Sequence, residues 1–543
     1  MIIKNTDSLE KIYPDKSPER RIEKAVILAD ERYNYQIAIY SETNFFCEFE
    51  IDSDISDSII VRKVDSVYSE FPIYPDHDEN IISDKPGMFP DLLSETPGNI
   101  IYGPAGWSSL WITVCAEKSE IGSHYISLRL KDPFRGEILE CGEKLTVNIL
   151  PEKLNGNKLI CTDWLHTDCL AEYYNTEVFS TEYWRITENF VKSATEHGIN
   201  MMLTPVFTPP LDTKRGGERL TVQLVEVYKK ENKYTFDFSN LQKWIDMCLR
   251  SGIIYFEISH LFTQWGAGAA PKIMADENGN YHRIFGWDTP SDSPEYTDFL
   301  NSFLPQLVTF LLDNGLAGKV YFHVSDEPQT EHIDSYKKAV NIVKNHINGK
   351  FRTLDALSDY DYYKKGLVDI PVPSSNHLEE FYTRGTQELW TYYCCAQYKG
   401  LSNRFMCMPS YRNRIIGIQM YLYGVKGFLH WGYNFYNTQN SFMKVNPYVT
   451  TAAGATFPSG DAFCVYPGSD GTALCSLRLE VFNDAVSDYN ALLALEAKIG
   501  REAVVGLIHQ NLGYKISMTE YPRSGEWIIR LREKINLMIN GQV

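Results

Sequence analysis

The chain has 543 residues, too many for one ordinary hydrophobic core, and this length predicts about three domains, or fewer if one is a large α/β barrel. It carries 52 Lys and Arg against 70 Asp and Glu, a net charge of −18. This acidic balance argues against nucleic acid or an anionic membrane as a partner, and no run of 18 apolar residues predicts a transmembrane helix.

The N-terminal twenty residues are polar and lack the apolar stretch of a secretory signal. The eleven cysteines are scattered and form no C-x-x-C pair, and the neighbours Cys394 and Cys395 have a poor geometry for pairing with each other. These features predict a cytoplasmic protein with reduced thiols.

Residues 1–157 are predicted to form an antiparallel β-sandwich. Short segments rich in β-branched and aromatic residues, several of them alternating with period two, are separated by Pro-Gly and Gly-Pro turn signals. The segments are 25–51, 58–71, 109–117, 124–130 and 144–151. Residues 152–158 (EKLNGNK) then read as a linker to the next domain.

Residues 158–500 are predicted to form a (β/α)8 barrel, because buried strand patterns alternate with helical ones and eight strands fit a barrel better than an open doubly wound sheet. Residues 501–543 are predicted to be a mainly helical C-terminal extension that packs on the barrel. The predicted strands are 158–166, 199–207, 253–260, 319–325, 351–357, 366–372, 388–394 and 427–433. The predicted helices include 180–198, 240–252, 330–346, 414–425 and 476–500.

The fourth predicted barrel strand ends in Ser325-Asp326-Glu327-Pro328. Such residues suit a helix N-terminus, with Pro328 at the first helical position. A carboxyl pair can also divide the labour of glycoside cleavage, because like charge and partial burial hold one group protonated as an acid. Capping and catalysis are compatible, and we expect both here.

Adjacency constrains what the two carboxylates can do. Neighbouring residues on a strand point to opposite faces, so Asp326 and Glu327 can converge only beyond the strand end, where Pro328 breaks the pattern. This favours Glu327 as general acid/base and Asp326 as a group that orients the substrate, and it disfavours a carboxylate that attacks the sugar directly.

Acids and aromatic residues also gather at the other strand ends, where barrel enzymes carry their functional groups. We predict that substrate contacts come from His166, Asp168, Glu257, His323, Trp390, Tyr392, Tyr393, His430, Trp431 and Tyr433. Asp163, Trp164, Asp212, His260 and Asp355 also lie at strand ends.

No cofactor or metal is predicted. His166, Asp168, Glu257, His260 and His323 could hold a metal if they converged, but their spacing matches no metal motif. The glycine-rich residues 266–271 lack the third glycine and the following helix of a dinucleotide loop. Residues 208–230 insert a long segment after the second strand, either a lid over the barrel mouth or a subunit contact.

The S-D-E-P motif and the segment GFLHWGYNFY at 427–436 together resemble glycoside hydrolase family 123 and the mostly uncharacterised bacterial proteins that share its catalytic domain. The similarity extends over 457–468 and 476–489, and the N-terminal sandwich matches the family's architecture. The resemblance implies a retaining hydrolase that removes terminal β-linked N-acetylhexosamine, with N-acetylgalactosamine preferred.

The resemblance also implies substrate assistance: the 2-acetamido oxygen attacks C1 to form an oxazoline, Glu327 is general acid then base, and Asp326 polarises the acetamido N–H. Trp390, Tyr392 and Trp431 would box the N-acetyl group, with Tyr393 and Tyr433 behind them.

Two alternatives stay open at this point. One is a glycosidase for sugars without an acetamido group, which needs a separate carboxylate nucleophile such as Glu257. The other is a non-catalytic carbohydrate-binding barrel protein. The expected partner is an oligosaccharide or glycoconjugate, with neither nucleic acid nor membrane, and homo-oligomerisation is open.

Overall fold

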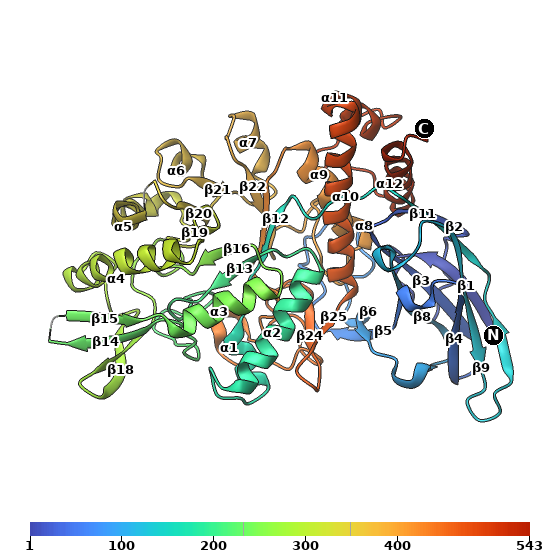
Figure 1. Cartoon of the computed structure of the whole chain (residues 1–543), viewed down its shortest axis with the longest axis horizontal. Helices are drawn as coiled ribbons and strands as arrows, with labels where there is room; N and C mark the ends of the chain where they lie inside the picture. Colours follow the sequence, from blue (N-terminus) through green and yellow to red (C-terminus); the bar gives the residue numbers. More distant parts are fainter. Residues whose placement is uncertain (232, 348, 543) are drawn as a thin grey trace.

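The computed structural model describes residues 1–231, 233–347 and 349–542. Figure 1 shows a β-sheet domain at one end of the molecule, a barrel with its helices at the other, and the long helix α10 between them. Over the described ranges, no helix is both long enough and apolar enough to cross a membrane.

The N-terminal domain is a sandwich of two sheets around a core of aliphatic and aromatic side chains. It is antiparallel as predicted except for one pair, because β2 and β11 run parallel. The first sheet has the order β1 (Ile2–Asp7), β3 (Arg32–Ser41), β8 (Gly106–Cys115), β5 (Ile59–Ser69), β6 (Gly87–Ser94). The second has β2 (Lys24–Leu28), β11 (Leu145–Leu150), β9 (Gly122–Lys131), β4 (Phe45–Ser53), β7 (Ile100–Gly103), with β10 (Ile138–Cys141) beside β9.

The barrel contains all eight predicted strands, and every neighbouring pair is parallel. A bridge between Ser374 and Tyr392 brings the two outermost strands together and nearly closes the barrel. In spatial order the strands are β21 (Ile370–Val372), β20 (Arg352–Ala356), β19 (Val320–Phe322), β16 (Tyr255–Ile258), β13 (Met201–Thr204), β12 (Ile160–Asp163), β23 (Gly427–His430) and β22 (Trp390–Tyr392).

Helices follow the barrel strands and cover them from outside (Figure 1). Two of the longer ones begin at serine caps: Ser180 and Ser293 each accept a hydrogen bond from a backbone N–H of the first turn. The helices are α1 (Thr167–Tyr173), α2 (Thr181–Glu196), α3 (Ser239–Arg250), α4 (Pro294–Asp313), α5 (Ile333–Ile347), α6 (Tyr360–Lys364), α7 (Leu378–Thr383), α8 (Ser410–Arg414), α9 (Ile416–Leu422), α10 (Leu477–Ile499), α11 (Arg501–Ile508) and α12 (Gly525–Ile539). Short 3-10 turns lie at Ser56–Ser58, Pro97–Asn99, Ala116–Lys118, Thr330–His332 and Gln439–Ser441.

The insertion after the second barrel strand is not simply a loop. Its end forms β14 (Glu226–Lys230), which pairs with β15 (Lys233–Asp237) and with the hairpin β17 (Ile273–Glu277) and β18 (Asn280–Phe285). This four-stranded sheet projects from the side of the barrel (Figure 1). A small hairpin of β24 (Val465–Pro467) and β25 (Ala473–Cys475) precedes α10.

Helix α10 joins the two domains through buried charge. Asp488 accepts a two-pronged hydrogen bond from Arg414 at 2.7 and 2.9 Å, and Arg532 of α12 donates to it at 3.0 Å. Glu480 pairs with Arg62 of the sandwich at 2.6 Å and with His197 at the end of α2 at 3.1 Å. Arg532 also pairs with Glu31 of the sandwich at 2.9 Å, so α12 contacts both domains.

Candidate active site

The loop that follows β19 carries Asp326 and Glu327 and is fixed by the loops and strands on both sides. The backbone N–H of Glu327 donates to the Ala356 carbonyl at 3.0 Å, and that of Trp265 donates to the Asp326 carbonyl at 2.8 Å. Glu327 has φ +43°, a left-handed conformation that is strained for a non-glycine residue and often marks a functional site.

The expected capping role is wrong. The helical segment begins at Thr330, capped by Gln329 in a reciprocal arrangement with His332, so Pro328 lies outside it and neither carboxylate caps a helix. The break after β19 is longer than the sequence pattern indicated, and this irregular stretch lets the two adjacent side chains reach one cavity.

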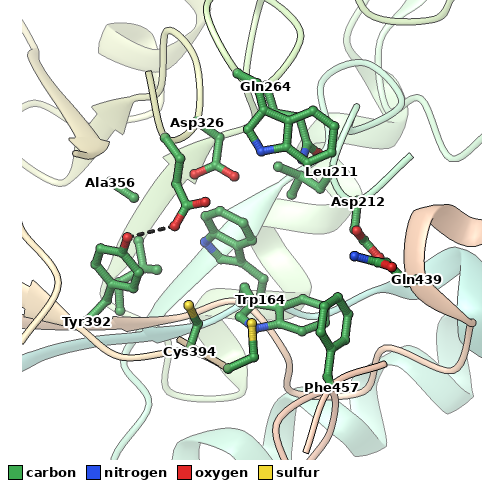
Figure 2. A pocket seen from close by; sticks show the side chains of 15 residues that line it. Trp164, Leu211, Asp212, Gln264, Asp326, Ala356, Tyr392, Cys394, Gln439 and Phe457 are labelled. Carbon is green, nitrogen blue, oxygen red and sulfur yellow. Dashed lines mark hydrogen bonds between the residues drawn. The ribbon is translucent and has the colours of Figure 1, made fainter. Parts of the chain in front are cut away.

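That cavity lies at the C-terminal mouth of the barrel (Figure 2). It holds about 720 Å³ of space including its open entrance. In Figure 2, Asp326 lies beside the carboxylate bonded by Tyr392, whereas Asp212 and Gln439 lie on the other side. The lining residues are Trp164, Leu211, Asp212, Gln264, Trp265, Asp326, Glu327, Ala356, Tyr392, Cys394, Cys395, Leu429, Trp431, Gln439 and Phe457.

Burial controls the electrostatics of the carboxyl pair. Burial and the neighbouring Glu327 raise the pKa of Asp326 well above its ordinary value. Burial also raises the pKa of Glu327, assisted by Asp461, whereas the hydrogen bond from Tyr392 at 2.6 Å lowers it in part. Because both shifts favour the protonated forms, the pair holds a proton more readily than two exposed carboxylates would.

Two predicted substrate-binding residues line the cavity, Tyr392 and Trp431. Tyr392 donates its hydroxyl hydrogen to Glu327. The Trp431 indole N–H donates to Asp461 at 3.2 Å, and its ring packs edge-on against Phe457 with centroids 5.4 Å apart. The cavity thus has an aromatic wall whose orientation is fixed by hydrogen bonds from behind.

Glu257 and His323 lie beneath the cavity floor and do not line it. Glu257 accepts hydrogen bonds from Thr162 at 2.8 Å and from the indole of Trp164 at 3.0 Å, and it contacts His323. The other nitrogen of His323 lies 2.9 Å from Asp355. Burial alone would lower the pKa of His323, but these two carboxylates raise it to about 10. This network orients Trp164, which forms the floor.

His166 and Asp168 lie behind the wall rather than in it. Arg219, from the insertion, donates two hydrogen bonds to the Asp168 carboxylate at 2.7 and 2.8 Å and one to His166 Nδ1 at 3.1 Å. His166 Nε2 donates to the Trp431 carbonyl at 2.8 Å. Burial and the neighbouring guanidinium lower the pKa of His166 to about 4, so the imidazole is neutral. The group anchors the insertion to the loop that carries Trp431.

The other four predicted substrate contacts are also buried behind the site. Trp390 precedes Tyr392 by two residues and shares its face, but it lies one layer deeper and donates to Glu388 at 3.1 Å. His430 contacts Arg404 at 2.6 Å. Tyr393 points away from the mouth because it is the neighbour of Tyr392, which faces inward. Tyr433 lies beyond the end of β23 and is fully buried. Their hydroxyls reach Asn413 and Phe190 at 3.3 and 3.4 Å.

Residues 164–495, more than half of the chain, match the model of the glycoside hydrolase 123 catalytic domain. The chain belongs to glycoside hydrolase family 123. The resemblance inferred from the S-D-E-P and GFLHWGYNFY motifs is therefore confirmed.

A solved family 123 glycoside hydrolase from Clostridium perfringens, described in terms of glycolipid glycan hydrolysis, superposes with a TM-score of 0.74 over 99% of this chain and 98% of that one, at 14% identity. This match confirms the predicted fold class, a β-sandwich followed by a (β/α)8 barrel and a helical C-terminal region, over the whole of this chain. Weaker matches include β-glucuronidases from Ruminococcus gnavus (TM-score 0.33, 8% identity, 81% and 68% coverage) and Parabacteroides merdae (0.30, 11%, 82% and 49%). No curated protein sequence matches.

Several cavity residues of this family 123 protein were absent from the predicted set. Gln264, Trp265, Gln439 and Phe457 come from loops that carry no periodic pattern, and Leu211 and Asp212 come from the start of the insertion. Asp212 has a strand-end position as its only signal. Burial raises its pKa to about 6, and it accepts a hydrogen bond from the Asn440 backbone at 3.0 Å.

Two buried groups could each offer three metal-ligand atoms within 4.8 Å of one another: His197, Cys475 and Glu480, and His260, His323 and Asp355. In each group one histidine already contacts a carboxylate of the same group. His197 contacts Glu480, and His323 contacts Asp355. A metal ion would have to displace these contacts, which already satisfy one carboxylate in each group.

Proposed function

We propose that this family 123 glycoside hydrolase removes terminal β-linked N-acetylhexosamine, with N-acetylgalactosamine preferred, by a retaining mechanism in which the substrate's acetamido group is the nucleophile. One observation carries the proposal: Asp326 and Glu327 reach one cavity wall from an irregular loop, and only Glu327 has a protein hydrogen-bond donor among the described residues.

Glu327 is assigned as the general acid that protonates the leaving oxygen and then as the base that activates water. A general acid must hold its proton near working pH, and burial raises the pKa of Glu327 accordingly. The Tyr392 hydroxyl fixes the position of one carboxylate oxygen and leaves the other free to face the glycosidic bond.

Asp326 is assigned as the acceptor of the acetamido N–H. In the free enzyme its pKa is raised well above the ordinary value, mainly because it is buried without a donor. A bound N–H would stabilise the carboxylate form and lower that pKa, which leaves the shared proton on Glu327. Substrate binding would thereby set the correct protonation state of both groups.

The alternative with a separate enzyme nucleophile is less well supported. Glu257, the carboxylate that it would need, is fully buried and accepts hydrogen bonds from Thr162 and Trp164 below the floor. Asp212 does line the cavity, but its carboxylate already accepts a hydrogen bond from Asn440, and its backbone carbonyl accepts one from Ser441 at 2.7 Å.

The test is a panel of chromogenic β-linked substrates: N-acetylgalactosaminide, N-acetylglucosaminide, galactoside and glucoside. Wild-type enzyme, Asp326→Asn, Glu327→Gln and Asp212→Asn would be compared on each. We expect hydrolysis of the acetamido sugars alone, with the galactosaminide fastest, and large losses in the first two variants. An oxazoline-mimicking thiazoline should inhibit competitively.

Galactoside hydrolysis without galactosaminide hydrolysis would exclude substrate assistance, and a collapse of rate in Asp212→Asn with normal Asp326→Asn would move the nucleophile to Asp212. Glycan binding without turnover of any substrate would favour the non-catalytic alternative.

A further inference from the structure

Cys394 and Cys395 stand apart from the other cysteines. Eight of the eleven are buried and Cys141 is exposed on the sandwich, whereas these two are half-buried and line the catalytic cavity. They follow Tyr393 directly in the loop after β22, and Cys394 lies on the same side of the cavity as Tyr392 (Figure 2). They are therefore accessible to whatever enters the cavity.

The two thiols are consecutive in the chain and line the same cavity. The neighbouring Cys395 thiol and burial raise the pKa of Cys394 well above its ordinary value. Gln397 Oε1 accepts hydrogen bonds from the Cys394 backbone at 2.9 Å and from its thiol at 3.3 Å. The loop thus presents two neighbouring thiols to one cavity, and Gln397 fixes the position of the first.

A direct disulfide does not suit this pair. The Cys394–Cys395 peptide is trans, which places consecutive Cα atoms about 3.8 Å apart, below the roughly 4.4–6.8 Å that disulfides span. A single soft atom inserted between the sulfurs relaxes this constraint. With atom–sulfur bonds of about 2.3 Å at the angles of about 90–100° found at a pyramidal atom, it bridges sulfurs about 3.3–3.5 Å apart, against about 2.05 Å for a disulfide.

We propose that Cys394 and Cys395 form a dithiol site in the cavity wall that captures trivalent arsenic compounds, and that the captured group blocks the cavity. Soft sulfur ligands favour soft acceptors of this kind. With an arsine oxide R–As=O, two As–S bonds form, the As=O bond breaks, and both thiol hydrogens leave with the oxygen as water. The oxidation state of arsenic and of sulfur does not change.

The two thiols should also respond differently to alkylating reagents and to arsine oxides. Alkylating reagents attack the thiolate, and the raised pKa of Cys394 keeps its thiolate scarce at neutral pH. Cys394 should therefore react slowly with iodoacetamide, whereas the two thiols together should bind an arsine oxide tightly. Capture depends on the thiols alone, whereas the consequence for hydrolysis rests on the proposed function.

The experiment treats the full-length enzyme with one equivalent of phenylarsine oxide and measures the adduct by native mass spectrometry. Cys394→Ser and Cys395→Ser are the test variants, and Cys141→Ser is the matched control at the exposed thiol. We expect one phenylarsenic group per chain in wild type and control, none in either test variant, and release by 1,2-ethanedithiol but not by 2-mercaptoethanol. If Cys395→Ser fails to fold, Cys395→Ala is used in its place.

Hydrolysis of the chromogenic β-N-acetylgalactosaminide is followed in parallel, each variant relative to its own untreated rate. Loss of hydrolysis that ethanedithiol restores supports blocking, and an adduct that leaves hydrolysis intact overturns it. An adduct that persists in both serine variants overturns the site itself. If wild type hydrolyses no substrate, the proposed function fails, while the mass measurement still decides whether the dithiol exists.

Discussion

The catalytic cavity and the α10 interface both remove carboxylates from water, but the pKa shifts of Asp326 and Glu327 in the cavity and of Glu480 at the interface have opposite directions. At α10, burial works against the charge of Glu480, yet Arg62 and His197 hold its pKa well below the ordinary value. In the cavity, Asp326 and Glu327 are half-buried without a cation in direct contact, and their pKa values rise.

The difference separates structure from chemistry. A buried carboxylate that is paired with cations and saturated with donors stabilises one arrangement of the chain, provided no partner is removed. A buried carboxylate without such partners can take up and release a proton at working pH, which is what acid–base catalysis requires. The two regions therefore predict opposite responses to mutation.

The largest expected effect is on activity in the cavity. Glu327→Gln should lower kcat/KM by about 10²–10⁴-fold, the usual contribution of a general acid or base, and leave the melting temperature unchanged. The loss should be smaller for a substrate whose leaving group needs little protonation. Steady-state kinetics on aryl and alkyl glycosides check this, with the exposed Glu331→Gln as control. An equal loss on both substrates would argue against Glu327 as the acid.

The interface should respond in stability. Glu480→Gln leaves Arg62 and His197 buried without their counter-charge, and breaking a buried pair in this way costs about 3–5 kcal/mol. Urea unfolding measures the loss, and the folded fraction should keep its KM. Glu496→Gln, at a more exposed position on the same helix, should cost at most about 1 kcal/mol. Similar losses in both variants would remove the distinction between the two regions.

Asp484, one turn from Glu480, departs from this contrast, because it is an interface carboxylate with a raised pKa. Burial raises its pKa from 3.8 to about 7, although Arg414 lowers it in part. The folded state therefore binds the proton more tightly than the unfolded state, so this group's contribution to stability falls as pH rises from about 4 to about 7. Asp484→Asn should flatten that slope by a few kcal/mol across the window. An unchanged slope in urea unfolding at several pH values would contradict the assignment.

The sequence predicted the strands and the carboxyl pair because both leave local signals. Eight apolar segments bounded by turns specify the barrel, and Asp326-Glu327-Pro328 interrupts one of them where a barrel site belongs. The capping prediction failed because the same residue types favour caps and sites, and tertiary contacts to Ala356 and Trp265 decided between them.

The remaining contacts could not be predicted for the same physical reason. Whether a strand-end residue faces the cavity or a buried network depends on partners far away in sequence. Arg219, some fifty residues along the chain, donates hydrogen bonds to His166 and Asp168. Trp164 donates one to Glu257. Gln264 and Phe457 reach the cavity only because their loops fold over it. No local pattern encodes either outcome.

The smallest expected effect lies in the link between Tyr392 and Glu327. The tyrosine hydroxyl stabilises the ionised carboxylate and so lowers its pKa, and a hydrogen bond to a charged group contributes about 1.5–3 kcal/mol. Tyr392→Phe should therefore raise the pKa of Glu327 further. Because the acid is active only when protonated, the alkaline limb of the kcat/KM profile should move to higher pH by about one unit. A variant that is slower at every pH with an unmoved limb would make Tyr392 part of the wall alone, and Glu327 would then owe its pKa to burial and Asp461.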